Sequence, residues 1–171
     1  MMALKDRVSE EYYKMPLREN PDAEEIYYYA VRNSNNNLKY LEQAAEMGYS
    51  SAYLRLAEIY HKGEIVEKDI EKALSYYKLY CETLNEYQKG RILYKIAMIY
   101  KDGDGIDKNL PIAIELLEEC IKLESVTNAP LELAEMYFNG NGVEKDIDKG
   151  IEILLNNIRK QDVNNLIKYL V

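Results

Sequence analysis

Apolar residues recur three times along this chain in the same helical pattern, each time on both sides of a short polar segment. The copies read LAEIYHKGEIVEKDIEKAL from Leu56, IAMIYKDGDGIDKNLPIAI from Ile96 and LAEMYFNGNGVEKDIDKGI from Leu133. In the first copy Ala52, Leu56, Ile59 and Tyr60 stand three and four residues apart, which is the spacing of one helix face. A repeat of about 37 to 40 residues with this pattern predicts stacked pairs of helices, since no pair can bury its apolar face alone.

The polar segment between the two helices of each copy has fixed residue types. A glycine follows the first helix, where tolerance of positive φ ends a helix, and Asp or Asn precedes the second helix, where its side chain can act as an N-cap. The glycines are Gly63, Gly103 and Gly140, and the predicted caps are Asp69, Asn109 and Asp146. A small residue follows each cap at a matched place, which favours close packing of the helices; these residues are Ala73, Ala113 and Gly150.

These signals predict one all-α domain over residues 1–171, an α-α superhelix of stacked helix-turn-helix repeats. We expect an N-terminal helix or cap at 1–22, with a short helix near residues 4–14, and a degenerate repeat at 23–50. Three repeats follow at 51–87, 88–125 and 126–160, and a C-terminal capping helix at 161–171. Asn20 and Pro21 are expected to cap the helix that starts near Ala23. Because the second full repeat has extra residues in TLNEYQKGR, the helices beside that segment are expected to be about one turn longer.

The repeated residues resemble the Sel-one-like repeats (SLR), relatives of the tetratricopeptide repeats. The first full copy matches that pattern at Ala52, Leu56, Tyr60, Gly63, Val66, Asp69, Lys72, Ala73 and Tyr77. The third copy matches it at Ala129, Leu133, Tyr137, Gly140, Gly142, Val143, Asp146 and Lys149. The resemblance covers about residues 23–160. It implies an α-solenoid that binds other proteins as a scaffold or adaptor. The residues themselves lead us to expect neither enzymatic activity nor a cofactor. The cysteine pairs of the penicillin-associated members are missing, so that activity is not implied.

Composition places the chain among ordinary globular proteins. Of its 171 residues, 47% are apolar and 30% are charged. No segment approaches the roughly 18 apolar residues of a membrane span, and the start MMALKDRVSEEYYKM has no apolar run, unlike a signal peptide. We therefore expect a cytoplasmic protein, with Cys81 and Cys120 as buried reduced thiols.

Negative charge is concentrated in the C-terminal half of the chain. Between Glu115 and Glu152 ten acidic residues oppose three lysines, which gives −7 of the total net charge of −8. Such a field repels phosphate groups, so we expect no nucleic acid and no membrane as a partner, but a protein with a basic surface. Two interpretations stay open. One is an adaptor; the other is a regulator or immunity-type neutraliser that occludes a basic partner with its acidic half.

The segment DGDGIDKN from Asp102 has the acids of a calcium loop but not their spacing. A calcium-binding EF-hand loop needs Gly at its sixth position and Glu at its twelfth, where this chain has Asp107 and Ala113. The equivalent loops of the other copies lack matching acids. The residues therefore predict a repeat turn and no metal site.

His61 is the only histidine, so His-based acid and base catalysis would depend on it. Its equivalents in the other copies are Lys101 and Phe138. We expect all three on the exposed side of the first helices, where a position that varies favours a contact residue over a catalyst. No catalytic residue is predicted.

Positions that differ between copies are the candidates for partner binding. In solenoids of helix pairs the first helices line the concave face, and side chains off their packed side would point into it. The predicted contact residues are Tyr53, Arg55, Glu58, His61, Lys95, Met98, Lys101, Glu132, Glu135 and Phe138. They predict a groove that is mixed or basic at its middle and acidic at its C-terminal end. The consecutive Tyr27, Tyr28 and Tyr29 cannot all face inward, so part of this run is a further candidate for contact with a partner.

Overall fold

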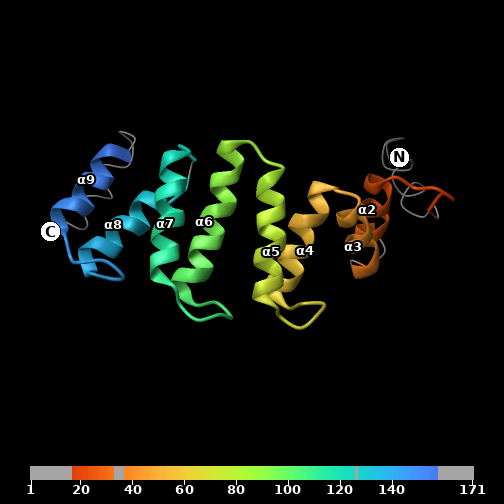
Figure 1. Cartoon of the computed structure of the whole chain (residues 1–171), viewed down its shortest axis with the longest axis horizontal. Coiled ribbons are helices and arrows are strands. Elements are labelled where there is room, and N and C mark those ends of the chain that lie inside the picture. The colour runs from red at the N-terminus through yellow and green to blue at the C-terminus, as the bar shows by residue number, and fades with distance from the viewer. Residues whose placement is uncertain (1–16, 33–36, 126, 158–171) are drawn as a thin grey trace, which may run out of the picture. The chain divides into compact units, whose positions relative to one another are not determined.

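The computed structural model describes residues 17–32, 37–125 and 127–157 of the chain. In these ranges all regular structure is helical, which confirms the predicted all-α class, and Figure 1 shows successive helices joined by short loops. The chain divides into two compact units, unit 1 (Met1–Thr83) and unit 2 (Leu84–Val171). The helices predicted near residues 4–14 and at 161–171 lie outside the described residues.

Unit 1 contains two helix pairs. The first pair is α2 (Ala23–Arg32) and α3 (Leu38–Glu46), and the second is α4 (Ser50–Lys62) and α5 (Ile70–Glu82). Each helix packs against the next one along the chain, so α3 contacts α2 on one side and α4 on the other. The degenerate segment therefore forms a pair of helices although its turn lacks the glycines of the other copies.

Unit 2 repeats this arrangement with α6 (Glu86–Asp102), α7 (Leu110–Lys122), α8 (Ala129–Asn139) and α9 (Ile147–Asn157). Helix α6 has 17 residues where α4 has 13, which confirms a helix about one turn longer at TLNEYQKGR. The same expectation for α5 was wrong, because α5 has 13 residues, as α7 does, and the extra residues extend α6 alone. The predicted boundary between residues 87 and 88 falls within the first turn of α6. In that added part a side chain at Gly90 would collide with Ser125, so α6 packs closely there against the loop that follows α7.

The three turns share one geometry, which explains why their residues recur. The glycines end the first helices in the left-handed region, with φ of 68° at Gly63, 70° at Gly103 and 68° at Gly140. The predicted N-caps are confirmed, since each side chain accepts the N–H three residues on, at 2.9 Å for Asp69, 3.2 Å for Asn109 and 2.8 Å for Asp146. These residues are accounted for by the turns.

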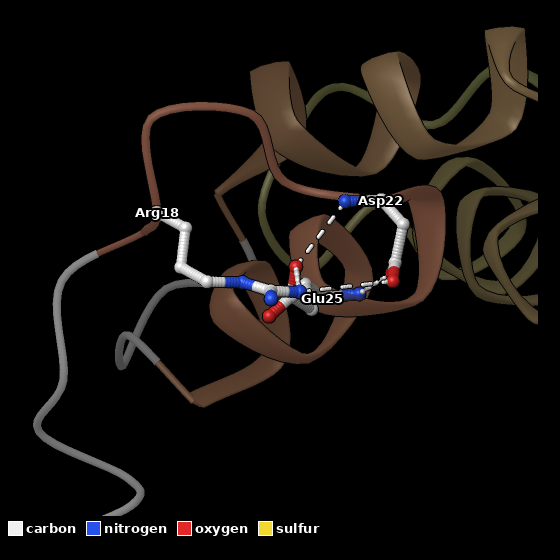
Figure 2. A network of polar contacts seen from close by, with 3 residues as sticks. All are labelled: Arg18, Asp22 and Glu25. Carbon is white, nitrogen blue, oxygen red and sulfur yellow. Dashed lines mark hydrogen bonds and ion pairs between the residues drawn. The ribbon is translucent and has the colours of Figure 1, made fainter.

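The start of α2 differs from the prediction. Asp22 Oδ1 accepts the N–H of Glu25 at 2.9 Å, and Glu25 Oε2 accepts the N–H of Asp22 at 3.2 Å, a capping box that Arg18 joins through ion pairs to both carboxylates (Figure 2). The predicted cap at Asn20 was wrong because the acidic partner of a capping box stands three residues after its cap. Asp22 has that partner, whereas Asn20 has Ala23 there.

The core consists of small and apolar residues at the repeated positions. Ala52, Ala57, Ala97 and Ala134 are fully buried, and so are the largest core side chains, among them Leu56, Tyr77 and Leu117. Cys81 and Cys120 are both buried and form no disulfide, as predicted for reduced thiols. The described helices include none that is long and apolar enough to cross a membrane.

Candidate functional site

The predicted contact residues fall into two sets, one in each unit. In unit 1 the set lies on α4 and comprises Tyr53, Arg55, Glu58 and His61. In unit 2 it lies on α6 and α8 and comprises Lys95, Met98, Lys101, Glu132, Glu135 and Phe138. Each unit therefore carries its own set.

In unit 1 charges and tyrosines share the surface of α2 and α4. Arg55 Nη1 lies 3.8 Å from Glu58 Oε2, and about a third of each side chain is exposed (36% and 31%). Burial raises the pKa of Tyr27 on α2, which the positive charge of Arg55 opposes. The Tyr27 ring also packs against Tyr28 and Tyr49, with centroid distances of 5.4 and 5.0 Å. Tyr27 is half-buried and Tyr28 is exposed, so part of the run Tyr27, Tyr28 and Tyr29 is accessible to solvent.

His61, Lys101 and Phe138 are all partly buried, so the prediction that they are exposed was wrong. His61 Nδ1 lies 3.4 Å from the Tyr77 hydroxyl, which belongs to α5. Phe138 packs against Ala134 and Leu154 and covers Gly150. The other copies have Ala73 and Ala113 at the position equivalent to Gly150. Gly150 lacks their Cβ, and the aromatic ring of Phe138 occupies the space that this leaves.

In unit 2 Lys101 forms an ion pair with Glu132, which joins α6 to α8, and only 19% of each side chain is exposed. The Tyr94 hydroxyl donates to the same carboxylate at 3.4 Å. Burial, followed by the charge of Glu132 and this hydrogen bond, raises the pKa of Tyr94 to about 12. The charge of Glu132 is therefore largely balanced within the protein.

A groove of about 550 Å³ lies in unit 1 between α3, α4 and α5, which follow one another in Figure 1. Its lining comprises Glu42, Ala45, Glu46, Tyr53, Lys72, Tyr76 and Leu79. Six of these seven residues come from the second helices α3 and α5. Of the predicted contact residues, Tyr53 alone is among them.

A hydrogen-bonded cluster links the three helices beside this groove. The Tyr60 hydroxyl donates to Glu42 Oε1 at 3.2 Å and accepts from Lys72 Nζ at 2.7 Å. Lys72 Nζ lies 4.3 Å from the Tyr60 ring centroid, and Tyr76 stacks on Tyr60 with centroids 6.0 Å apart. The hydrogen bond to Tyr60 raises the pKa of Lys72, and burial, with the charge of Glu42 next, raises that of Tyr76. The groove therefore offers fixed charges and aromatic faces.

Sequence reasoning missed this groove. Tyr60 and Lys72 belong to the repeated pattern, and neither they nor Glu42, Glu46 and Tyr76 are among the predicted contact residues. A signal was present, since Lys122 and Ile153 stand where Glu46 and Tyr76 would recur in unit 2. The described part of the chain contains no group of three or more His, Cys, Asp or Glu side chains that could hold a metal ion.

Comparison with known proteins identifies the repeat. The sequence matches the Sel1 repeat at residues 38–49, 50–82, 93–122 and 129–155. No curated protein matches the chain. A similar solved structure is that of a protective antigen present in uropathogenic Escherichia coli strains displaying an SLR fold, with 20% identity and a TM-score of 0.61 over 79% of this chain and 30% of that one. Another is a Sel1 repeat protein from Oxalobacter formigenes, with 18% identity and a TM-score of 0.62 over 88% of this chain and 63% of that one.

The chain thus spans less than two thirds of the length of either of these structures, and at such identities the similarity shows the fold alone. Sel1 repeat proteins are in general non-catalytic scaffolds that bind other proteins. The four matched segments together cover more than half of the sequence and include the three glycine turns and the caps Asp69, Asn109 and Asp146. The predicted resemblance is confirmed, and the chain belongs to the Sel1 repeat family.

Proposed function

We propose that this chain is a scaffold or adaptor that binds a partner protein through the first helices of its repeats, on the concave face of the solenoid. One observation carries this proposal. Arg55, Lys95 and Glu132 occupy equivalent, partly exposed positions of α4, α6 and α8, yet they differ in charge. Residues around them recur because turns, caps and core require them. A position whose residue differs between copies while the residues around it recur is where recognition of a partner can be encoded.

Quantitative affinity purification from the native cell tests this proposal. The bait is the full chain, either unchanged, as Arg55→Glu, or as Lys78→Glu. Lys78 is a matched control because it is an exposed lysine of the second helix α5. We expect a partner that the unchanged chain and Lys78→Glu retain and that Arg55→Glu loses. A partner retained equally by all three baits contradicts the assignment of the face, and the absence of any specific partner contradicts the scaffold function.

The acidic C-terminal half supports a second candidate, a regulator or neutraliser that occludes a basic partner. Glu115, Glu118 and Glu144 are exposed, and none of their carboxylates has an ion-pair partner within the described ranges. Association steered by such charges loses its rate steeply as ionic strength rises. Stopped-flow measurement of the association rate at about 0.05 and 0.5 M salt separates the candidates. A neutraliser is expected to lose roughly tenfold or more in this rate, whereas a scaffold with mixed charges changes little.

A further inference from the structure

We propose that the groove between α3, α4 and α5 is a second binding site, which takes an arginine-bearing segment of a partner protein. This inference rests on the proposed function, because it assumes that the chain binds proteins. It assigns a different surface, since the second helices supply six of the seven lining residues. A second site in one unit is what an adaptor that holds two partners would need.

The size and openness of the groove fit a segment of polypeptide. A volume of about 550 Å³ lies within the range of roughly 300 to 1,000 Å³ that is usual for ligand sites. Glu46 and Leu79 of its wall are exposed, Leu79 by 39%. A ligand in this groove therefore stays partly in solvent, as a chain does where it enters and leaves a site.

The unbalanced charge in the groove is negative. Its lining has two carboxylates, of Glu42 and Glu46, and one ammonium group, of Lys72. That ammonium group is already engaged, because it donates to the Tyr60 hydroxyl at 2.7 Å and lies 4.3 Å from the centroid of the same ring. The Glu46 carboxylate has no hydrogen-bond or ion-pair partner among residues 17–32, 37–125 and 127–157. The complementary ligand is therefore a cation.

The aromatic side chains favour arginine over lysine. Tyr53 and Tyr76 both line the groove, and Tyr76 already stacks on Tyr60 with an angle of 11° between the planes. A guanidinium group is flat, stacks on aromatic rings and binds a carboxylate through two parallel hydrogen bonds, which an ammonium group cannot do. Ala45 and Leu79 supply apolar surface for the stem of such a side chain and for an apolar neighbour.

The first experiment measures binding of short peptides to the full chain. The probes are acetylated and amidated Ala-Leu-Arg-Leu-Ala and the same peptide with Lys, Gln or Glu in place of Arg. Binding is followed by chemical shifts of the ¹⁵N-labelled chain. We expect the Arg peptide to shift signals of α3 and α5 and to bind roughly fivefold more tightly than the Gln peptide, as one partly exposed charged contact allows. The Lys peptide should lie between them, and the Glu peptide should bind most weakly.

Variants of the groove then locate the site. Glu46→Lys introduces the residue type that unit 2 has at the equivalent Lys122, and it should weaken binding of the Arg peptide about tenfold or more. Tyr76→Leu keeps apolar surface but removes the ring, and it should weaken binding about threefold. Glu82→Lys is the matched control, since Glu82 is an exposed glutamate at the equivalent position of α5 and does not line the groove. The Glu82→Lys variant should bind the Arg peptide with the same affinity as the unchanged chain.

Several outcomes overturn the inference. Equal affinity for the Arg and Gln peptides would show that the groove does not recognise arginine. An equal loss of affinity in Glu46→Lys and Glu82→Lys would show that Glu46 does not form the site. Free arginine that binds as tightly as the peptide identifies a small-molecule site, and self-association that Glu46→Lys abolishes in sedimentation identifies a second copy as the occupant. The proposed function fails separately. If Arg55→Glu still distinguishes a partner while all peptides fail to bind, only the groove assignment is lost.

Discussion

Unit 1 and unit 2 place the same three residue types at equivalent positions of three successive helices. Glu42, Tyr60 and Lys72 in unit 1 correspond to Glu118, Tyr137 and Lys149 in unit 2. In unit 1 the three side chains form one hydrogen-bonded cluster. In unit 2 the Tyr137 hydroxyl has no hydrogen bond to a described residue, and Lys149 Nζ lies 3.3 Å from Glu152 instead.

The neighbours of these three residues account for the difference. Tyr76 stacks on Tyr60 in unit 1, whereas unit 2 has Ile153 at the equivalent position, and Lys122 stands where unit 1 has Glu46. The repeated tyrosine is buried in unit 1 and partly buried in unit 2, and it organises a polar surface only where the variable residues beside it are aromatic and acidic. A position that recurs for structural reasons can take part in recognition in one copy alone.

The largest effect on stability is expected at Gly150 of unit 2, which stands at the position equivalent to Ala73 of unit 1. We expect Gly150→Ala to lower the free energy of unfolding by about 1 to 2 kcal/mol, because overpacking against Phe138 outweighs the gain in helix propensity. Urea denaturation measures this change. Phe138→Leu in the same chain makes room for the added methyl group and should recover part of the loss. A single Gly150→Ala variant more stable than the unchanged chain would show that the ring does not restrain this position.

A second contrast concerns the first helices. Glu132 is tied to Lys101 across two helices, whereas the equivalent Arg55 pairs within its own helix. We expect Glu132→Gln to cost about 1 to 2 kcal/mol of unfolding free energy, since it leaves a partly buried lysine without its carboxylate. Glu119→Gln breaks the more exposed pair with Lys89 and should cost less than about 0.5 kcal/mol. Equal costs in thermal or urea unfolding would refute the distinction between the two pairs.

Removal of single hydroxyl groups tests the cluster itself. Tyr60→Phe should lower the free energy of unfolding by about 1 kcal/mol, because Glu42 and Lys72 lose a shared partner. Tyr137→Phe removes the equivalent hydroxyl of unit 2 and should change the stability by less than about 0.3 kcal/mol. Both values come from urea denaturation at neutral pH. A cost as large for Tyr137→Phe as for Tyr60→Phe would mean that the two units do not differ here.

The raised pKa of Tyr94 is expected to have the smallest effect on stability at neutral pH, because this ring titrates only at much higher pH. The equivalent residue of unit 1 is Leu54, which does not titrate. The pKa of Tyr94 is raised from 10.0 to about 12, so the folded state holds the phenol proton more tightly than the unfolded state. The resulting stability is complete below pH 10 and is lost as the pH rises toward 12. NMR titration of the Tyr94 ring should show this pKa, and Glu132→Gln should lower it. If the ring titrates near pH 10 in the unchanged chain, burial and Glu132 do not control it.

The fold could be predicted because its signals lie within single helices and turns. Gly63 and Asp69, six residues apart, mark the end of one helix and the start of the next, and the same pair of signals recurs in each copy. The cap of α2 was missed although Asp22 and Glu25 form an equally local signal. Pro21 favours a helix start directly after Asn20, whereas the acid three residues after Asp22 marks the actual cap.

The site could be predicted only in part, because its contacts join different helices. Phe138 was placed on the surface since its equivalents are His61 and Lys101, and the space above Gly150 becomes visible only when α8 and α9 pack together. The groove in unit 1 depends similarly on three helices. From its place in the helical pattern, Tyr60 is predicted only as a core residue. Its hydrogen bonds to Glu42 and Lys72 follow from the arrangement of α3 and α5 around α4.

The cluster around Tyr60 also implies an order in which contacts form while the chain is being synthesised. Glu42 on α3 meets Lys72 through Tyr60, and Lys72 lies two helices further along the chain. During synthesis, which proceeds from the N-terminus, α3 and α4 leave the ribosome before α5 does. The cluster that Glu42 and Tyr60 begin is therefore complete only after α5 has emerged, so the degenerate helix pair depends on the repeat that follows it for the final partner, Lys72.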